Sequence, residues 1–163
     1  MITQPAQRPT LLICLLLGLS GCAWETPPPL EQEAPGAVVA SPTTASRAAQ
    51  FALWQKGAPY RYGGASPQGF DCSGLVHYAY GLAGKNVPRT TADLHRRATP
   101  VSKAALETGD LVFFNIDGKV SHVGIYLDRG RFIHAPRTGR TVSVESLDSD
   151  FYRRAFLGGG RLP

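Results

Sequence analysis

The stretch GFDCSGLVHY, residues 69–78, sets the start of a helix and with it the interpretation of the folded part of the chain. Asp71 is a residue type that caps helices, because its carboxylate accepts the backbone N–H of Ser73 or Gly74. Apolar residues then follow at helical spacing, at Leu75, Ala79 and Leu82. The segment GLAGKN ends the element. Cys72 is therefore expected in the first turn of a helix, directly after its cap.

The N-terminus predicts an exported protein. Arg8 precedes the apolar run LLICLLLGL, residues 11–19. This run is far shorter than the roughly 20 apolar residues that span a bilayer, so it indicates a signal peptide over residues 1–21. The alternative, a membrane-spanning helix, does not fit this length.

The residues around the expected cleavage site predict a lipid anchor. Ser20 and Gly21 before Cys22 resemble a bacterial lipobox, in which the cysteine becomes the acylated N-terminus. An ordinary secreted protein with a chance cysteine is the alternative. Because Ala23 rather than Asp follows, the resemblance favours the outer membrane, with the protein facing the periplasm of a Gram-negative bacterium. Two or three acyl chains make a stable anchor.

The remaining organisation follows from proline and cysteine usage. Residues 22–45 are rich in proline and read as an extended tether that spans roughly 60 Å. The folded domain is expected over residues 46–163, with Ser46 as N-cap of a helix that Gly57 closes. Cys14 leaves with the signal peptide and Cys22 carries lipid, so Cys72 is the remaining thiol. This accounting excludes a disulfide within the mature chain.

Length and charge limit the function classes. The chain has 163 residues and a formal net charge of +5. Such a length holds one domain with a real core. A basic surface suits an anionic cell wall or lipid headgroups, and no motif supports binding of nucleic acid. We expect a monomer.

The second half of the chain predicts strands. Short runs rich in β-branched and aromatic residues alternate with turn residues, in DLVFF, SHVGIYL, RFIHA and TVSV. A short helix is expected from Thr90 or Thr91 to Ala98. The closing segment FYRRAFLGGGRL is ambiguous and is a candidate for a last strand. Helices followed by an antiparallel meander define an α+β fold.

The register of one hairpin brings two histidines together. If the loop DRG is a three-residue hairpin loop, Leu127 pairs with Arg131. His134 then lies opposite Gly124, and His122 lies one diagonal step away on the same face, about 7 to 8 Å distant. Gly124 is expected to leave open space between and above them. A two-residue loop would instead place the histidines on opposite faces.

Three interpretations of these histidines remain open from the residues alone. They are buried polar groups, or metal ligands with Cys72 as a third donor, or a base and its orienting partner beside a nucleophilic thiol. No CxxC or HExxH spacing supports a metal. A buried small hydrophobe is the usual fate of a free cysteine. The start of a helix favours the thiolate form of a cysteine, so we favour the interpretation of Cys72 as a nucleophile.

The motifs YRYGG, DCSGLV, GDLVFF, HVGIYL and FIHA together resemble those of the NlpC/P60 cysteine peptidases, over roughly residues 46–162. The chain is most similar to single-domain lipoprotein members of the Spr type. The resemblance implies a papain-like α+β fold, with N-terminal helices packed on a central antiparallel sheet. It also implies hydrolysis of amide bonds in peptidoglycan stem peptides or their cross-links.

Carried over by motif, the resemblance implies that Cys72 is the nucleophile and His122 the general base. His134 is the polar residue that orients the base, and the hydroxyl of Tyr60 helps to polarise the substrate carbonyl. No metal or organic cofactor is implied. The implied partners are peptidoglycan stem peptides and, through the lipid on Cys22, a membrane.

Several alternatives and minor roles stay open. The bond is either the γ-D-glutamyl to diamino-acid bond or the D-alanyl to diaminopimelate cross-link. An acyltransferase or amidase and a non-catalytic wall-binding lipoprotein are the rival functions. Gly63 and Gly64 are expected to form a tight bend against the helix, and Asp110 to cap a turn before a strand. Three arginines either meet substrate carboxylates or lie solvated on the surface, namely Arg61, Arg89 and Arg137.

Overall fold

The computed structural model describes residues 41–116 and 118–163, and the fold is given for these residues. The predicted signal peptide, residues 1–21, the predicted lipid-bearing Cys22 and most of the predicted tether lie outside them. Among the described helices, none has the length and apolarity needed to cross a membrane.

Helix α1, Thr44–Leu53, begins earlier than the sequence predicted. Thr43 is its N-cap, and its hydroxyl accepts the backbone N–H of Ser46 at 3.1 Å. The prediction that Ser46 caps the helix is therefore wrong, because Thr43 already supplies the capping oxygen and the Ser46 hydroxyl donates back to the Thr43 carbonyl. The helix ends at Leu53, and a turn follows to Gly57, which has a φ of 92°.

Helices α2, Cys72–Leu82, and α3, Thr91–Arg97, confirm the other two predicted helices. The Asp71 carboxylate caps α2 by accepting the N–H of Gly74 at 2.6 Å. Thr90 caps α3. The buried face of α1 consists of alanines, which allow α1 to pack closely against α2. The buried side chains of the two helices belong to one cluster: Ala48, Ala49, Ala52, Leu75, Val76 and Ala79.

The strands form one large antiparallel sheet with the order β3-β8-β4-β5-β6-β7. Its strands are β3 (Thr99–Val101), β4 (Leu111–Asn115), β5 (Val120–Tyr126), β6 (Arg131–His134), β7 (Ser143–Ser146) and β8 (Phe156–Arg161). A separate pair comprises β1 (Ala65–Ser66) and β2 (Gly69–Phe70), and a 3-10 turn covers Lys103–Ala105. The α+β class and the antiparallel meander over β4 to β7 are confirmed.

The closing segment, which the sequence left ambiguous, supplies the expected last strand in its second half only. It first forms helix α4, Asp150–Ala155, and only then β8. Strand β8 lies inside the sheet, between β3 and β4, instead of extending the meander at its edge. Its glycines allow this position, since a side chain at Gly159 or Gly160 would collide with Leu106, Ala98 or Phe113.

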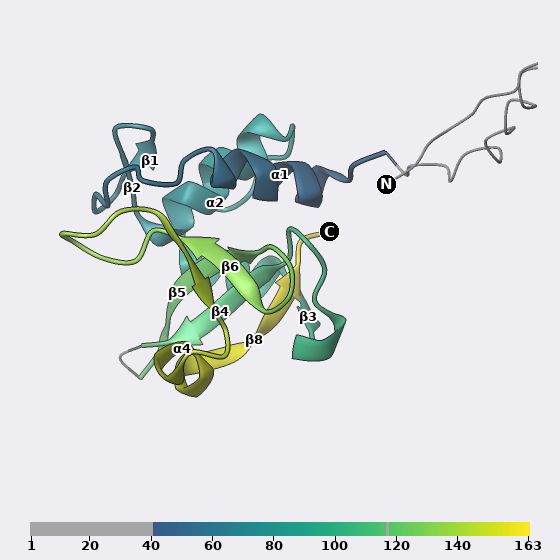
Figure 1. Ribbon diagram of the computed structural model, residues 1–163. Helices are drawn as coiled ribbons and strands as arrows, with labels where there is room; N and C mark the ends of the chain where they lie inside the picture. Colours follow the sequence, from purple (N-terminus) through teal and green to yellow (C-terminus); the bar gives the residue numbers. More distant parts are fainter. Residues whose placement is uncertain (1–40, 117) are drawn as a thin grey trace, which may run out of the picture. The chain divides into compact units, whose positions relative to one another are not determined.

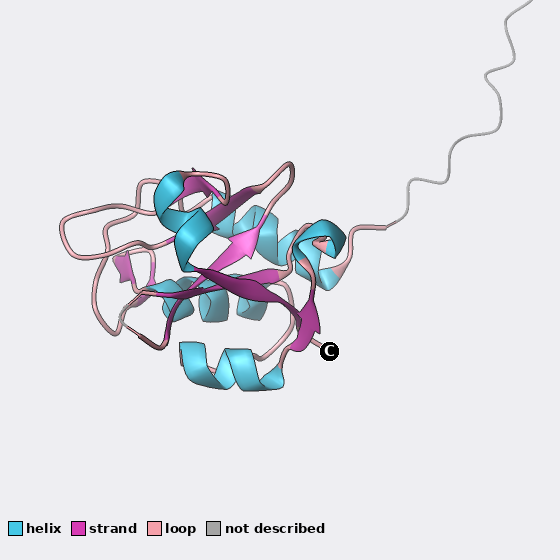
Figure 2. Cartoon of the chain, turned by 90° about the horizontal axis from the view of Figure 1, so that it is seen from below, coloured by secondary structure: helices cyan, strands magenta, loops and turns pink. Residues whose placement is uncertain are grey.

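The sheet has an apolar core on each face, because successive strand residues point to opposite sides. One core contains Leu111, Phe113, Val123, Ile125 and Ile133 together with α1 and α2. The other contains Val112, Phe114, Phe132 and Leu147, with Tyr152 and Ala155 of α4 packed against it. Figure 1 shows α1 and α2 on one side of the sheet and α4 on the other, and Figure 2 shows strands between helical segments.

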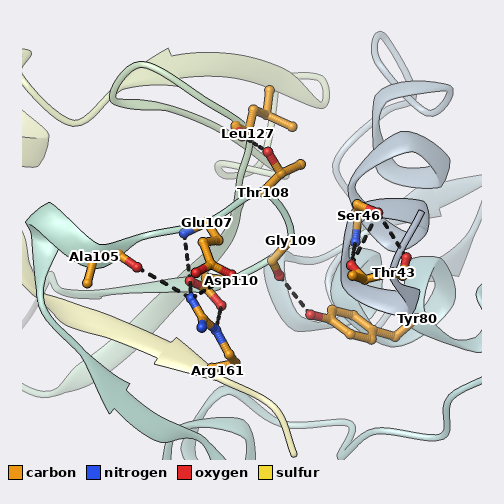
Figure 3. A network of polar contacts seen from close by, with 10 residues as sticks. All are labelled: Thr43, Ser46, Tyr80, Ala105, Glu107, Thr108, Gly109, Asp110, Leu127 and Arg161. Atoms are coloured by element: carbon orange, nitrogen blue, oxygen red, sulfur yellow. Dashed lines mark hydrogen bonds and ion pairs between the residues drawn. The ribbon is translucent and has the colours of Figure 1, made fainter. Parts of the chain in front are cut away.

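An ion pair between a buried aspartate and a partly exposed arginine stabilises the start of β4 (Figure 3). Asp110 is 2% exposed and receives two hydrogen bonds from Arg161 on β8, at 2.8 and 2.7 Å. It also accepts the N–H of Glu107, so the predicted capping role is confirmed. Next to it, the Tyr80 hydroxyl of α2 donates to the Gly109 carbonyl at 2.7 Å. These bonds tie helix, sheet and turn together.

The loop before β1 packs directly on the first turn of α2, as the two glycines predicted. Gly63 has a φ of 72°, and the carbonyl of Gly64 accepts the N–H of Asp71 at 3.0 Å. A Cβ on Gly74 would overlap that carbonyl oxygen and approach the Asp71 carboxylate to 2.9 Å. The backbone of the loop at Gly64 thus contacts the backbone of α2 at Gly74 directly.

Two glycines of α2 give a matched test of this contact. Gly74→Ala should lower the free energy of unfolding by at least about 2 kcal/mol, because neither carbonyl nor cap can move away. Gly81→Ala has open space around it and should raise stability by about 0.5 to 1 kcal/mol, as expected for a helical glycine. Urea denaturation measures both. Equal effects of the two substitutions would contradict the close contact.

Candidate active site

Cys72 is the first residue of α2, and its half-buried sulfur faces the sheet and the start of α3. The sulfur lies 3.6 Å from the Thr91 hydroxyl. The backbone N–H of Val123 on β5 also interacts with it. Two elements distant in sequence therefore hold the thiol in place.

The sulfur occupies a gap left by strand β6. Leu127 donates its N–H to Arg131 across the β5–β6 hairpin, and alternate residues of a strand direct their N–H groups to the same side. Val123 therefore points its N–H toward the β6 side, but pairing with β6 ends at Ile125 and Ile133. The thiol of Cys72 sits where the sheet would otherwise continue.

Arg89 fixes the cap of this helix. Its guanidinium donates to both oxygens of Asp71, at 2.9 and 2.8 Å, and to the Ser73 hydroxyl and the Gly64 carbonyl. Burial alone would raise the pKa of Asp71, but hydrogen bonds from Arg89 and from the N–H groups of Gly74 and Gly63 hold this pKa below its ordinary value. Arg89 is thus a structural residue, neither a free substrate contact nor a solvated surface charge.

Burial dominates the protonation of Cys72. It raises the pKa of the thiol, and the negative charge of Asp71 acts in the same direction. The Thr91 hydroxyl and the N–H groups of Val123 and Ser73 favour thiolate without outweighing burial. The N–H groups at the helix start favour thiolate as the sequence predicted, but in the free site removal from water costs the charged form more than these groups return, so the pKa of Cys72 is raised.

The two histidines meet as the hairpin register predicted. Leu127 donates its N–H to the Arg131 carbonyl at 2.9 Å across a three-residue turn, in which Gly130 has a φ of 74°. Continued one residue beyond the Ile125–Ile133 pair, the same register places His134 opposite Gly124. The histidine rings meet there, with His122 Nε2 and His134 Nδ1 2.7 Å apart. A β-bulge at the start of β5 immediately precedes His122. Such bulges reorient neighbouring side chains.

The predicted open space over Gly124 is absent. A Cβ on Gly124 would lie 2.6 Å from the ring of Phe132. The glycine therefore admits a neighbouring aromatic ring, and the histidine pair is packed instead of solvated. Spacing along the sequence could not show which side chain turns over that position.

Aromatic packing sets the charge state of the pair. His134 is fully buried and contacts the rings of Phe132 and Tyr152, and His122 lies near Phe114. Burial lowers the pKa of His122 to about 4 and that of His134 to about 3, where the neighbouring His122 adds to the effect. Both rings are neutral at physiological pH.

The metal-site alternative finds no suitable donor set in the part of the chain that the structure describes. No group of three His, Cys, Asp or Glu side chains there is arranged to hold a metal ion. The two histidines are bonded to each other through ring nitrogens, which removes one nitrogen of each from coordination.

A pocket of about 680 Å³ opens beside the cysteine. It brings together three of the residues that the sequence singled out, namely Tyr60, Cys72 and His122, and it also takes in Arg137. His134 lies behind His122 and does not line it. Arg61 is exposed and lies outside the pocket lining.

Other residues at the site had no role predicted from the sequence. Thr91 contacts the sulfur, and the further lining of the pocket includes Arg140, Glu145 and Tyr152. Tyr152 had no signal because its segment was read as a strand. Arg140 could have been found from the turn sequence PRTGR, which follows FIHA directly.

The fold and these motif residues identify the protein's family. The chain belongs to the NlpC/P60 family, which it matches over residues 57–161.

Individual relatives agree with this assignment. The murein DD-endopeptidase MepH of Escherichia coli is 45% identical over 116 residues, which cover 68% of this chain and 43% of the relative. A γ-D-glutamyl-L-lysine dipeptidyl-peptidase of Bacillus cereus is 39% identical over 108 residues, covering 64% of this chain and 32% of the relative. The chain thus spans less than half the length of these relatives.

Solved structures show the same architecture. An NlpC/P60 family protein of Bacillus cereus superimposes with a TM-score of 0.70 at 35% identity, covering 76% of this chain and 42% of that one. The predicted papain-like NlpC/P60 fold is confirmed.

Acid stability should report the buried histidine pair. In the folded protein the pKa of His122 is about 4 and that of His134 about 3, both below the ordinary value of 6.5. At a pH between these values and 6.5, unfolding is therefore accompanied by uptake of protons. Stability is therefore complete above about pH 6.5 and falls as the pH drops toward 4. The slope reaches about 1.4 kcal/mol per pH unit for each histidine. Urea denaturation at a series of pH values measures it.

His134→Gln is the matched variant for that slope, because an amide keeps hydrogen-bonding groups and does not titrate. It should remove roughly half of the pH dependence between pH 6.5 and 4.5. A wild-type stability that stays flat over this range would show that the histidines are not buried as neutral rings.

Proposed function

We propose that this protein is a peptidoglycan endopeptidase that hydrolyses amide bonds of stem peptides or their cross-links through a Cys72 acyl-enzyme. One observation carries the proposal: Cys72, at the start of α2, and His122, bonded to His134, line the same pocket of an NlpC/P60 domain. The names of the relatives, a murein DD-endopeptidase and a γ-D-glutamyl-L-lysine dipeptidyl-peptidase, support this substrate class.

His122 acts as the base through one specific nitrogen. Its Nε2 is engaged with His134, which leaves Nδ1 to accept the thiol proton. This requires His122 to carry its own proton on Nε2 and to donate it to His134 Nδ1. Because the thiol pKa is raised and the pKa of His122 is about 4, the resting pair is uncharged. Charge develops only when the substrate is attacked.

A third ring completes the chain that selects this tautomer. His134 Nδ1 must accept, so its proton resides on Nε2, which lies 3.4 Å from the Tyr152 hydroxyl. The Tyr152 hydroxyl can accept a hydrogen bond from the N–H at His134 Nε2. This bond favours the tautomer of His134 whose Nδ1 accepts from His122 Nε2, and His122 Nδ1 is then free. His134 and Tyr152 are therefore positioning residues that act through His122.

The reaction then proceeds in two halves. The thiol gives its proton to His122 Nδ1, the sulfur attacks the amide carbonyl, and the leaving amine takes the proton from His122. His122 next removes a proton from water, which attacks the thioester, releases the carboxylic acid product and restores the thiol.

The developing oxyanion meets two groups of the pocket. The backbone N–H of Cys72 has no protein acceptor within residues 41–116 and 118–163, so it is free to donate to substrate. The Tyr60 hydroxyl is the second donor, and burial together with Cys72 and Asp71 raises its pKa, so it remains protonated. Such preorganised donors stabilise tetrahedral intermediates.

The proposal extends to location. The lipobox-like residues before Cys22 support lipidation of that cysteine, retention at the outer membrane and exposure to the periplasm. The proline-rich segment would then let the domain reach peptidoglycan away from the membrane surface.

Digestion of purified sacculi tests the activity. The wild-type protein should release soluble muropeptides, and Cys72→Ala should lower the rate by at least about a thousandfold, because the nucleophile is lost. Mass spectrometry of the fragments identifies the cleaved bond, either the γ-D-glutamyl to diamino-acid bond or the D-alanyl to diaminopimelate cross-link. Circular dichroism confirms the fold of the variant. Full activity of a folded Cys72→Ala protein would refute the proposal.

Tyr152→Phe tests the positioning chain. Loss of the hydroxyl should lower kcat about two- to tenfold, the value of one hydrogen bond, while KM stays near the wild-type value. Tyr126→Phe is the control, because Tyr126 packs in the same aromatic core but its hydroxyl bonds to the N–H of Gly130, away from the histidines. A change in KM alone, or equal losses of kcat in both variants, would contradict the role of Tyr152.

A further inference from the structure

Two arginines stand at the ends of one tight turn beside the pocket. The loop between β6 and β7 turns at residues 137–140, where Arg140 donates its N–H to the Arg137 carbonyl at 3.1 Å. Gly139, with a φ of 80°, allows this turn. The turn presents Arg137 and Arg140 to the same pocket, and both line it.

Backbone bonds fix this turn to the candidate active site. Tyr60 donates its N–H to the Arg140 carbonyl at 2.9 Å, and Val142 donates to Ala58 at 2.8 Å. Pro59 and Thr141 form a β-bridge between these two bonds. The arginine turn is therefore attached to the segment that carries Tyr60, next to Cys72.

The side chains of both arginines are without a partner among the described residues. Within the described residues, no ion pair or side-chain hydrogen bond involves Arg137 or Arg140, whereas Arg89 pairs with Asp71 and Arg161 with Asp110. One acidic residue, Glu145, also lines the pocket. Burial and the charge of Glu145 raise the pKa of Tyr152, and the charges of Arg140 and Arg137 lower it. The lining keeps an excess of positive charge.

Each candidate substrate bond has a free carboxylate beside it. A γ-linked D-glutamyl residue keeps its α-carboxylate unbonded, on the acyl side of the amide. In a D-alanyl to diaminopimelate cross-link, the carbon that bears the leaving nitrogen also bears a carboxylate. An arginine pair next to the cysteine is suited to either group, because guanidinium donates bidentate hydrogen bonds to carboxylates.

We propose that Arg137 and Arg140 form a subsite for the free carboxylate adjacent to the scissile amide. This inference rests on the proposed function and adds the chemical group that the pocket selects. Its two sources, the D-glutamyl and the diaminopimelate carboxylate, lie on opposite sides of their bonds, so the subsite also determines which bond is placed at the sulfur.

The test compares paired substrates. Each is a muropeptide that holds one candidate bond, prepared with the adjacent carboxylate either free or amidated. The variant Arg137→Gln/Arg140→Gln should raise KM about tenfold for the preferred free-carboxylate substrate, with little change in kcat. For the amidated partner it should change KM by less than about twofold. Amidation should weaken wild-type binding by a similar factor.

The control removes the same charge elsewhere. Arg129→Gln/Arg131→Gln changes one arginine in the β5–β6 turn and the first residue of β6. Both lie at the other end of the hairpin from the histidines, so the variant should leave both KM values unchanged. The pocket variant should lose its preference for the free over the amidated carboxylate in one of the two substrate pairs. That pair identifies which carboxylate the subsite binds.

The outcomes separate the two proposals. If the wild type cleaves muropeptides but the pocket variant affects free and amidated substrates equally, the subsite is refuted while the endopeptidase stands. If the wild type cleaves neither bond in any substrate, the proposed function fails and the subsite fails with it.

Discussion

The site depends on the fixed start of helix α2. The Asp71 carboxylate caps the helix at Gly74, Arg89 holds that carboxylate with two hydrogen bonds, and the Gly64 carbonyl rests on the first turn. No side chain separates loop from helix at this point, so the helix cannot shift along the sheet. Cys72 is thereby held at the edge of β5 where β6 departs, and the pocket, the histidine pair and the arginine turn are arranged around this position.

Burial gives this arrangement an uncharged resting state. The same packing that positions the groups raises the pKa of the Cys72 thiol and lowers that of His122 to about 4. A protonated thiol is a poor nucleophile and reacts slowly with oxidants. In our account reactivity arises when substrate enters, because the oxyanion donors and His122 then stabilise the charges together. The chain from His122 through His134 to Tyr152 keeps the required nitrogen of the base free.

Local rules predicted the features that depend on neighbouring residues. The cap at Asp71 and the register that aligns His122 with His134 follow from residue type and spacing. Features set by distant packing were missed or wrong. Thr43 rather than Ser46 caps α1, the ring of Phe132 fills the space over Gly124, and the last segment divides into α4 and β8. The rise in the pKa of Cys72 was missed for the same reason, because burial of the thiol depends on β5 and α3.

The protonation of His122 is the most direct test of this account. Nitrogen-15 NMR of the histidine-labelled wild-type protein at neutral pH distinguishes protonated from unprotonated ring nitrogens. The account predicts a neutral ring with its proton on Nε2 and a bare Nδ1, which titrates only near pH 4. A doubly protonated His122 at neutral pH would indicate a resting thiolate–imidazolium pair, and a neutral ring with its proton on Nδ1 would leave Cys72 without a base. Either result would contradict the mechanism.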